Sequence, residues 1–302
     1  MKHIVSFSGG RTSAYLVHLM EQKRKDNGWE VEYVFADTGA EHPKTYEFVR
    51  QVVKHYGINL TCLRAVYSNK KGVGVTYKKV PINKIGWDLS IIETQVKIYG
   101  NFTINRPNCT SRMKADVMDK YKKETYGKSN YYQWLGMRID EPRRLKFINL
   151  NDDMFTSKKL NPNNIRYLAE ISDFEKSDVL EWWGEMPFDL QIEEHLGNCV
   201  FCIKKASKKI ALAARDEPIL FDDWNEAITG SHVRLMPTDK LGTGHIYRGW
   251  LSPDKLIAQF SDVATSHLKE MVYKGKKNDV GSCSESCEID FDQMDMFKEV
   301  SQ

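Results

Sequence analysis

The sequence predicts an α/β protein with a doubly wound, mostly parallel sheet and a smaller cysteine-bearing region at its C-terminal end. Three observations lead to this fold class. Short apolar runs alternate with helix-like stretches through the first third of the chain. A glycine turn joins the first run to the first helix-like stretch. Helical crossovers between consecutive strands make those strands parallel.

The individual elements follow from hydrophobic periodicity. Short runs that are apolar or alternating are typical of strands. We expect strands at residues 3–8, 31–36, 58–62 and 131–137. Apolar residues at spacings of three and four are typical of amphipathic helices. We expect helices at residues 12–25, 46–56 and 203–215, and a short helix at 178–183.

Other segments lack such periodicity. Residues 68–103 contain several glycines and a proline, and we expect an irregular, mobile excursion there. Residues 151–164 are polar and are expected to form a loop. We place an α/β nucleotide-binding domain at 1–195. A helical region with a polar, cysteine-bearing tail is expected at 196–302.

The composition is that of an ordinary globular protein, with 41% hydrophobic and 28% charged residues among 302. The first residues lead directly into the glycine turn, without a segment like a signal-peptide cleavage site. No apolar run approaches the length of a membrane span. We therefore expect a cytoplasmic protein with no membrane partner.

The formal net charge of +3 is too small to indicate a nucleic-acid partner by itself. Lysine pairs are nevertheless frequent: Lys70-Lys71, Lys78-Lys79, Lys204-Lys205, Lys208-Lys209 and Lys276-Lys277. Such pairs are typical of solvated surface. The alternative is a basic face for a polyanionic acceptor such as tRNA or DNA.

A phosphate-binding loop is predicted at Ser8-Gly9-Gly10-Arg11-Thr12-Ser13. The two glycines let the backbone turn tightly and approach an anion. The helix that follows supplies unpaired N–H groups and the positive end of its dipole. The three hydroxyl side chains add donors, and Arg11 adds a cationic fork. The Walker A pattern G-K-[ST] is absent.

This loop resembles the pyrophosphate loop (PP-loop) of the adenine nucleotide α-hydrolase superfamily, whose usual form is S-G-G-x-D-S. Thr12 occupies the position of the usual Asp, and Arg11 a position where Lys is common. The resemblance implies a Rossmann-like fold, ATP or a sulfonucleotide as ligand, and a catalytic role for Arg11.

Two further segments resemble the branch that contains phosphoadenosine phosphosulfate (PAPS) reductases and ATP sulfurylases. Residues 35–46, with Asp37-Thr38-Gly39, are similar to its second signature. Residues 135–141 are similar to its G-x-R strand end, whose arginine faces the nucleotide. The likeness spans roughly residues 2–202. It implies nucleotide contacts from Asp37, Thr38, Gly39 and Arg138. For Arg138, a surface ion pair with a nearby acid is the alternative.

The six cysteines are unevenly placed, which in a cytosolic protein is more typical of metal or redox chemistry than of disulfides. The short C-x-x-C loop of Cys199 and Cys202 turns both sulfurs toward one point. The stretch around Cys109 resembles the one in iron–sulfur adenylylsulfate reductases that carries a cysteine pair. The resemblance implies a [4Fe–4S] cluster on these three cysteines, with Cys283 as fourth ligand or one iron left open. Zinc and unmetallated thiols are the alternatives.

The tail offers a second role for its cysteines. Sulfonucleotide reductases carry a nucleophilic cysteine on a mobile C-terminal tail, and by this resemblance Cys287 is our candidate nucleophile. Cys287 is also an alternative fourth cluster ligand. The family's tail motif E-C-G-x-H is absent, so an ordinary tail is the alternative. Cys62 lies on an alternating strand and is expected to be a small core residue.

Three functions follow. The first is an AMP-forming enzyme that uses ATP and Mg²⁺ to adenylate an acceptor, which then receives sulfur from a donor protein. The second is a sulfonucleotide reductase that acts on adenylylsulfate or PAPS and needs a thiol reductant protein. The third is a non-catalytic nucleotide-binding module with a structural zinc. The complete loop favours the first, the cysteine arrangement the second, and Thr12 the third.

Overall fold

The computed structural model describes residues 1–68, 73–103, 106–127, 130–145, 164–237, 245–248 and 250–274. Several expectations lie outside these ranges. They are nearly all of the loop at 151–164, the pairs Lys70-Lys71 and Lys276-Lys277, and the tail with Cys283 and Cys287.

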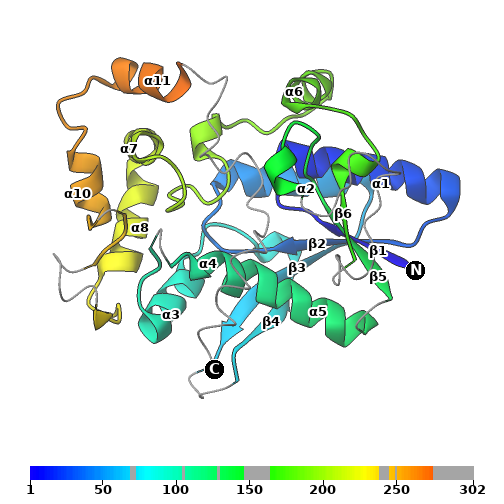
Figure 1. Ribbon diagram of the computed structural model, residues 1–302, viewed down its shortest axis with the longest axis horizontal. Helices are drawn as coiled ribbons and strands as arrows, with labels where there is room; N and C mark the ends of the chain where they lie inside the picture. The colour runs from blue at the N-terminus through cyan, green and yellow to red at the C-terminus, as the bar shows by residue number, and fades with distance from the viewer. Residues whose placement is uncertain are drawn as a thin grey trace.

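A sheet lies at the centre of the molecule, and its described strands have the order β4-β3-β2-β1-β5-β6 (Figure 1). The strands are β1 (Lys2–Ser6), β2 (Val31–Ala36), β3 (Leu60–Tyr67), β4 (Val75–Val80), β5 (Tyr131–Leu135) and β6 (Ile165–Tyr167). Only the β3–β4 pair among them is antiparallel. His3 of β1 pairs with Val31 on one side and Tyr132 on the other. The predicted doubly wound, mostly parallel sheet is confirmed.

Helices cover both faces of the sheet (Figure 1). One face carries α1 (Arg11–Asn27), α2 (Pro43–Tyr56) and α6 (Lys176–Gly184), and the other carries α3 (Ser90–Tyr99) and α5 (Asp116–Tyr126). Successive strand residues point to opposite faces, so Val34 joins one core while Tyr33 and Phe35 join the other. Burial on both sides explains why successive residues at the centre of these strands, Ile4-Val5 in β1 and residues 33–35 in β2, are apolar or aromatic.

Later helices gather beside the sheet (Figure 1). They are α7 (Ser207–Asp216), α8 (Pro218–Thr229), α10 (Pro253–Ala258) and α11 (Thr265–Tyr273). Phe221 and Trp224 of α8 join the same core cluster as Ile92 and Phe102. The expected domain boundary at residue 195 stays a prediction. No helix in the described ranges has the length and apolarity needed to cross a membrane.

The expectation of an irregular excursion at 68–103 is wrong for its described part. That part contains β4, a 3-10 turn at Ile82–Lys84, and α3. β4 was not predicted because its exposed Lys78 and Lys79 interrupt the apolar pattern that is typical of a strand. Such residues are tolerated there because β4 lies at the edge of the sheet. In α3 the buried Ile92 and Val96 are four residues apart, which is a helical spacing.

Other elements have shifted bounds as well. The first strand ends at Ser6, because the chain already turns into the glycine loop. The third strand continues to Tyr67. The helix expected at 203–215 begins at Ser207, since the residues after the C-x-x-C form turns.

Candidate nucleotide and thiol site

The predicted phosphate loop connects β1 to α1. Ser8 and Ser13 close it: their Oγ atoms are 2.9 Å apart, and the Ser8 backbone N–H donates to Ser13 Oγ at 3.2 Å. Ser13 Oγ in turn donates to the Gly10 carbonyl at 3.0 Å. No side chain of the described residues caps α1 at Gly10. The first N–H groups of α1 therefore keep their capacity to bind an anion.

Gly9 has a structural reason to be glycine. Its φ is +85°, in the left-handed region that a Cβ disfavours. A Cβ at this position would lie 2.9 Å from Thr45 Cγ2 and 3.2 Å from Val49 Cγ2. Both partners belong to α2, so the loop is pressed against that helix.

Arg11 is held by another part of the chain. Its Nε and one terminal nitrogen bind the two carboxylate oxygens of Asp189 at 2.7 and 2.8 Å. The guanidinium also donates to the Leu190 carbonyl. Its positive charge is therefore already offset in this structure, and the catalytic role of Arg11 stays a prediction.

Arg138 reaches the phosphate loop. One terminal nitrogen donates to Thr12 Oγ1 at 3.0 Å, while Nε binds Asp140 Oδ1 at 2.8 Å. Arg138 is only 2% exposed. The ion pair with a nearby acid exists, but Arg138 is buried next to the loop and not on the surface, and a nucleotide contact from Arg138 stays a prediction. The substitution of Thr12 for the usual Asp provides the hydroxyl that Arg138 binds.

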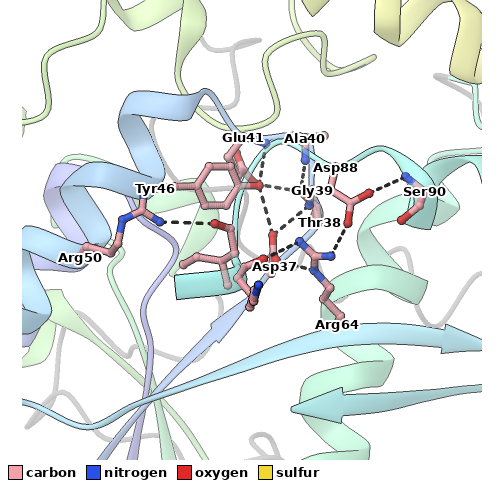
Figure 2. Close-up of polar contacts among 12 residues, drawn as sticks. Asp37, Thr38, Gly39, Ala40, Glu41, Tyr46, Arg50, Arg64, Asp88 and Ser90 are labelled. Atoms are coloured by element: carbon pink, nitrogen blue, oxygen red, sulfur yellow. Dashed lines mark hydrogen bonds and ion pairs between the residues drawn. The ribbon is translucent and has the colours of Figure 1, made fainter. Parts of the chain in front are cut away.

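Asp37, at the carboxyl end of β2, is the hub of a buried polar cluster (Figure 2). Its Oδ1 accepts hydrogen bonds from the Gly39 N–H at 3.0 Å and the Tyr46 hydroxyl at 3.1 Å. Its Oδ2 accepts one from Arg64 Nε at 2.6 Å, and Arg64 also binds Asp88. Burial raises the pKa of Asp37, and the charge of Arg64 opposes that rise. In this structure Asp37 holds the turn at residues 37–39, and a nucleotide contact from it stays a prediction.

Gly39 allows a close approach between two segments. Its φ is +73°, and a Cβ there would lie 2.0 Å from the Asp88 carbonyl oxygen. The Gly39 carbonyl accepts a hydrogen bond from the Asp88 N–H at 2.9 Å. The Asp-Thr-Gly turn therefore has one shape, which fixes Thr38 and the residues after it.

The phosphate loop lines a partly open cavity whose empty volume, open solvent included, is about 370 Å³. We call it the phosphate-loop cavity; besides residues 8–11 it is lined by Glu41, Thr45, three residues of 190–193, Glu194, Gly197 and Asn198.

Cys109, Cys199 and Cys202 line a second cavity, together with Thr38 and Lys114. We call it the thiol cavity. Cys199 reaches it because its segment pairs with the turn after β2: Val200 N–H donates to the Ala40 carbonyl at 3.0 Å. The tertiary structure thus gathers three predicted ligand cysteines that are far apart in sequence.

Glu41 lies where the two cavities meet. Its Oε1 accepts hydrogen bonds from Lys114 Nζ at 3.1 Å, Thr38 Oγ1 at 3.3 Å and the Cys199 thiol at 3.6 Å. Glu41 and Lys114 are 1% and 9% exposed. A carboxylate of the phosphate-loop cavity is therefore bonded to residues of the thiol cavity.

Side-chain donors form hydrogen bonds to the backbone of the C-x-x-C loop. Three of them bind backbone carbonyls of segment 200–203: Lys205 Nζ to Val200 at 2.8 Å, the Tyr247 hydroxyl to Phe201, and Arg248 to Ile203 at 2.6 Å. Lys205 and Tyr247 are buried. These bonds fix the direction in which the loop presents its sulfurs.

Sequence reasoning placed Glu41 and Lys114 within motifs but gave them no role, and it missed Asp189 and Tyr247. The only sequence signal for the first two is their place inside the resembling segments. Asp189 and Tyr247 carry no local signal, because their partners are 178 and 46 residues away. Cys62 is buried in the core, as expected.

The fold and the loop define an α/β nucleotide-binding protein of the PP-loop class. The model of the phosphoadenosine phosphosulfate reductase domain matches residues 2–182, and the chain belongs to that family. It is 45% identical over 306 residues to "Uncharacterized nin region protein ORF290" of Escherichia phage lambda, covering 98% of this chain and 97% of that protein. It is also 37% identical over 67 residues to "Phosphoadenosine 5'-phosphosulfate reductase" of Alteromonas mediterranea. That match covers 22% of this chain and 25% of the reductase.

Proposed function

We propose that this chain binds ATP on the phosphate loop and uses it for AMP-forming activation of an acceptor that then receives sulfur. The observation that carries the proposal is the shared wall of the two cavities. Glu41 lines the phosphate-loop cavity and is bonded to Cys199 of the thiol cavity. Nucleotide phosphates and thiols would therefore lie on either side of one carboxylate.

The reaction would proceed in two steps. An acceptor oxygen attacks the α-phosphorus of ATP, and the bond to the leaving pyrophosphate breaks. The N–H groups at the start of α1 stabilise the leaving anion, since they need no reorganisation. The terminal sulfur of a persulfide on a donor protein then attacks the activated carbon and displaces AMP. A thiolate next attacks the donor cysteine's sulfur and breaks the S–S bond, which leaves the transferred sulfur on the acceptor. The disulfide formed in this step is reduced by a thiol reductant protein.

Cys109, Cys199 and Cys202, which line the thiol cavity, are our proposed ligands of a metal group. Thiolates bind both iron–sulfur clusters and zinc, so these cysteines would hold a [4Fe–4S] cluster or, as the alternative, a zinc ion. A bound cluster would supply a redox-active iron or a site for sulfide.

Among the described lysine pairs, some side chains are exposed, as binding to a nucleic-acid acceptor requires, and others are buried. Lys78 and Lys79 are both exposed on β4. Lys205 and Lys209 are buried, and their amines bind backbone carbonyls and Glu194. A nucleic-acid acceptor therefore stays a prediction, to be tested by binding to single-stranded and folded RNA and to DNA.

A sulfonucleotide reductase is the second candidate, favoured by the family to which the chain belongs. A thiolate would attack the sulfur of adenylylsulfate or PAPS and release AMP or adenosine bisphosphate. The resulting cysteine S-sulfonate would be reduced by a thiol protein, which releases sulfite. The same loop would then hold the phosphate of the sulfonucleotide.

Thermal-shift measurements on anaerobically purified protein distinguish the two. A ligand that binds only the folded state raises the melting temperature by an amount set by its concentration relative to Kd. The proposal expects a shift with Mg-ATP and release of AMP and pyrophosphate when acceptor is present. A shift with adenylylsulfate or PAPS but none with Mg-ATP would refute it and support the reductase.

A further inference from the structure

The two carboxylate oxygens of Glu41 have different surroundings. Oε1 is bonded to Lys114, Thr38 and Cys199. Oε2 is buried as well, and it has no hydrogen-bond partner among the described residues. A buried carboxylate oxygen without a partner costs free energy, and such atoms are rare unless a ligand binds them. Glu41 lines the phosphate-loop cavity, so its carboxylate lies beside any ligand bound there.

The charges around this cavity are unsuited to a bare polyphosphate. Glu193 and Glu194 line it together with Glu41. Arg11 also lines it, but Asp189 already binds Nε and one terminal nitrogen of that guanidinium. Lysines pair with all three carboxylates: Lys114 with Glu41, Lys269 with Glu193, and both Lys176 and Lys209 with Glu194. A nucleotide phosphate chain would add several negative charges that these existing pairs leave largely uncompensated. A divalent cation bound between carboxylate and phosphate removes the resulting repulsion.

We propose that Glu41 Oε2 is a protein ligand of a divalent cation, Mg²⁺, that enters with the nucleotide phosphates. Mg²⁺ takes oxygen ligands and in nucleotide sites is bound by one or two carboxylates, the phosphates and water. The position fits, because Glu41 follows β2 at the same sheet edge as the phosphate loop after β1. This inference rests on the proposed function, since it requires that the ligand is ATP.

Calorimetric titration with α,β-methylene-ATP tests the assignment without turnover. Wild-type protein and the Glu41→Gln variant are titrated with excess Mg²⁺ and with a chelator. Loss of groups that support a metal costs about 10- to 100-fold in affinity, and loss of a ligand at least as much. Wild-type protein should bind the analogue at least tenfold more tightly with Mg²⁺, and Glu41→Gln should lose that difference. With Mn²⁺ in place of Mg²⁺, water-proton relaxation should show a ternary complex only for the wild type.

Two controls separate a ligand from a structural residue. Glu194→Gln alters another carboxylate of the cavity, which binds Lys176 and Lys209, and should keep the Mg²⁺ dependence. Lys114→Met removes the ion pair on the Oε1 side and should keep it too. Unfolding midpoints without ligand check that each variant folds.

The opposite results have distinct meanings. Equal affinity of the wild type with Mg²⁺ and with chelator would overturn the assignment and leave the ATP proposal intact. Retained Mg²⁺ dependence in Glu41→Gln would also overturn the assignment. So would a folded Lys114→Met variant that loses as much of the Mg²⁺ dependence as Glu41→Gln does. Binding of adenylylsulfate but not of the ATP analogue would refute the proposed function itself, and this inference with it.

Discussion

Replacing Gly9 by Ala is the sharpest test of the phosphate loop. The added methyl group meets two problems in this structure. Residue 9 has φ +85°, which costs an L-residue about 1–2 kcal/mol. The new Cβ would also lie 2.9 Å from Thr45 Cγ2 and 3.2 Å from Val49 Cγ2. Overpacking of this kind costs about 1–3 kcal/mol.

The expected loss in free energy of unfolding is therefore the sum, about 2–5 kcal/mol. A domain stability of about 5–15 kcal/mol leaves the variant folded in most of this range. Relief of the crowding would move the loop away from α2 and change the positions of its N–H groups. The nucleotide-induced rise in melting temperature should then be lost.

Gly28→Ala is the matched control. Gly28 ends the same helix at φ +66°, and a Cβ added there would meet no atom within 4 Å. Gly28→Ala should lower the free energy of unfolding only by the cost of the positive φ, about 1–2 kcal/mol, and leave nucleotide binding unchanged. Urea unfolding of both variants gives the comparison. If Gly9→Ala costs no more than Gly28→Ala, the crowding argument is wrong. Adding Thr45→Ser, which deletes the nearest methyl, should recover part of the difference.

Three further predictions concern buried groups. Arg64→Met removes the cation that opposes the burial-induced rise in the pKa of Asp37, and should cost about 3–5 kcal/mol at neutral pH. When the pKa of a carboxyl is raised in the folded state, the free energy of unfolding of the protein falls as pH rises through that pKa. The loss caused by Arg64→Met, measured by urea unfolding, should therefore be smaller near pH 4 than at pH 8. An equal loss at both would contradict this. Burial raises the pKa of Cys62 to about 12, so iodoacetamide at pH 8 should label Cys62 only after unfolding, as peptide mass mapping will show. Burial lowers the pKa of His195 in the folded state below its unfolded value of about 6.5. The unfolded state therefore binds a proton more readily, and the free energy of unfolding should fall as pH drops below about 6.5. Urea unfolding of a folded His195→Gln variant should lack this pH dependence.

Local patterns were enough for the loop after β1 and for four of the strands, β1, β2, β3 and β5, but not for β4 and β6. The strand, the two glycines and the helix periodicity are contiguous in sequence, so backbone sterics and hydrophobic burial act on neighbouring residues. Residues 68–103 were misjudged because an edge strand with exposed lysines lacks the apolar run of a central strand.

Arg138 shows how far a local pattern can be interpreted. Its place after a strand and before two acidic residues predicted both a nucleotide-facing arginine and an ion pair. The ion pair to Asp140 is local, two residues away. The bond to Thr12 crosses 126 residues and depends on β5 lying next to β1. Only that strand order brings the two together.

The sequence by itself determined the fold class, the order of the main elements and the position of the phosphate loop, because these depend on side-chain periodicity and glycine conformations within short segments. The tertiary structure alone decided that Arg11 is bound to Asp189, and that Glu41 joins the phosphate-loop cavity to the thiol cavity. It also brought Cys109 and the C-x-x-C into one cavity. Such contacts join residues far apart in the chain. They exist only after the sheet has fixed which loops share an edge, and no local pattern contains that information.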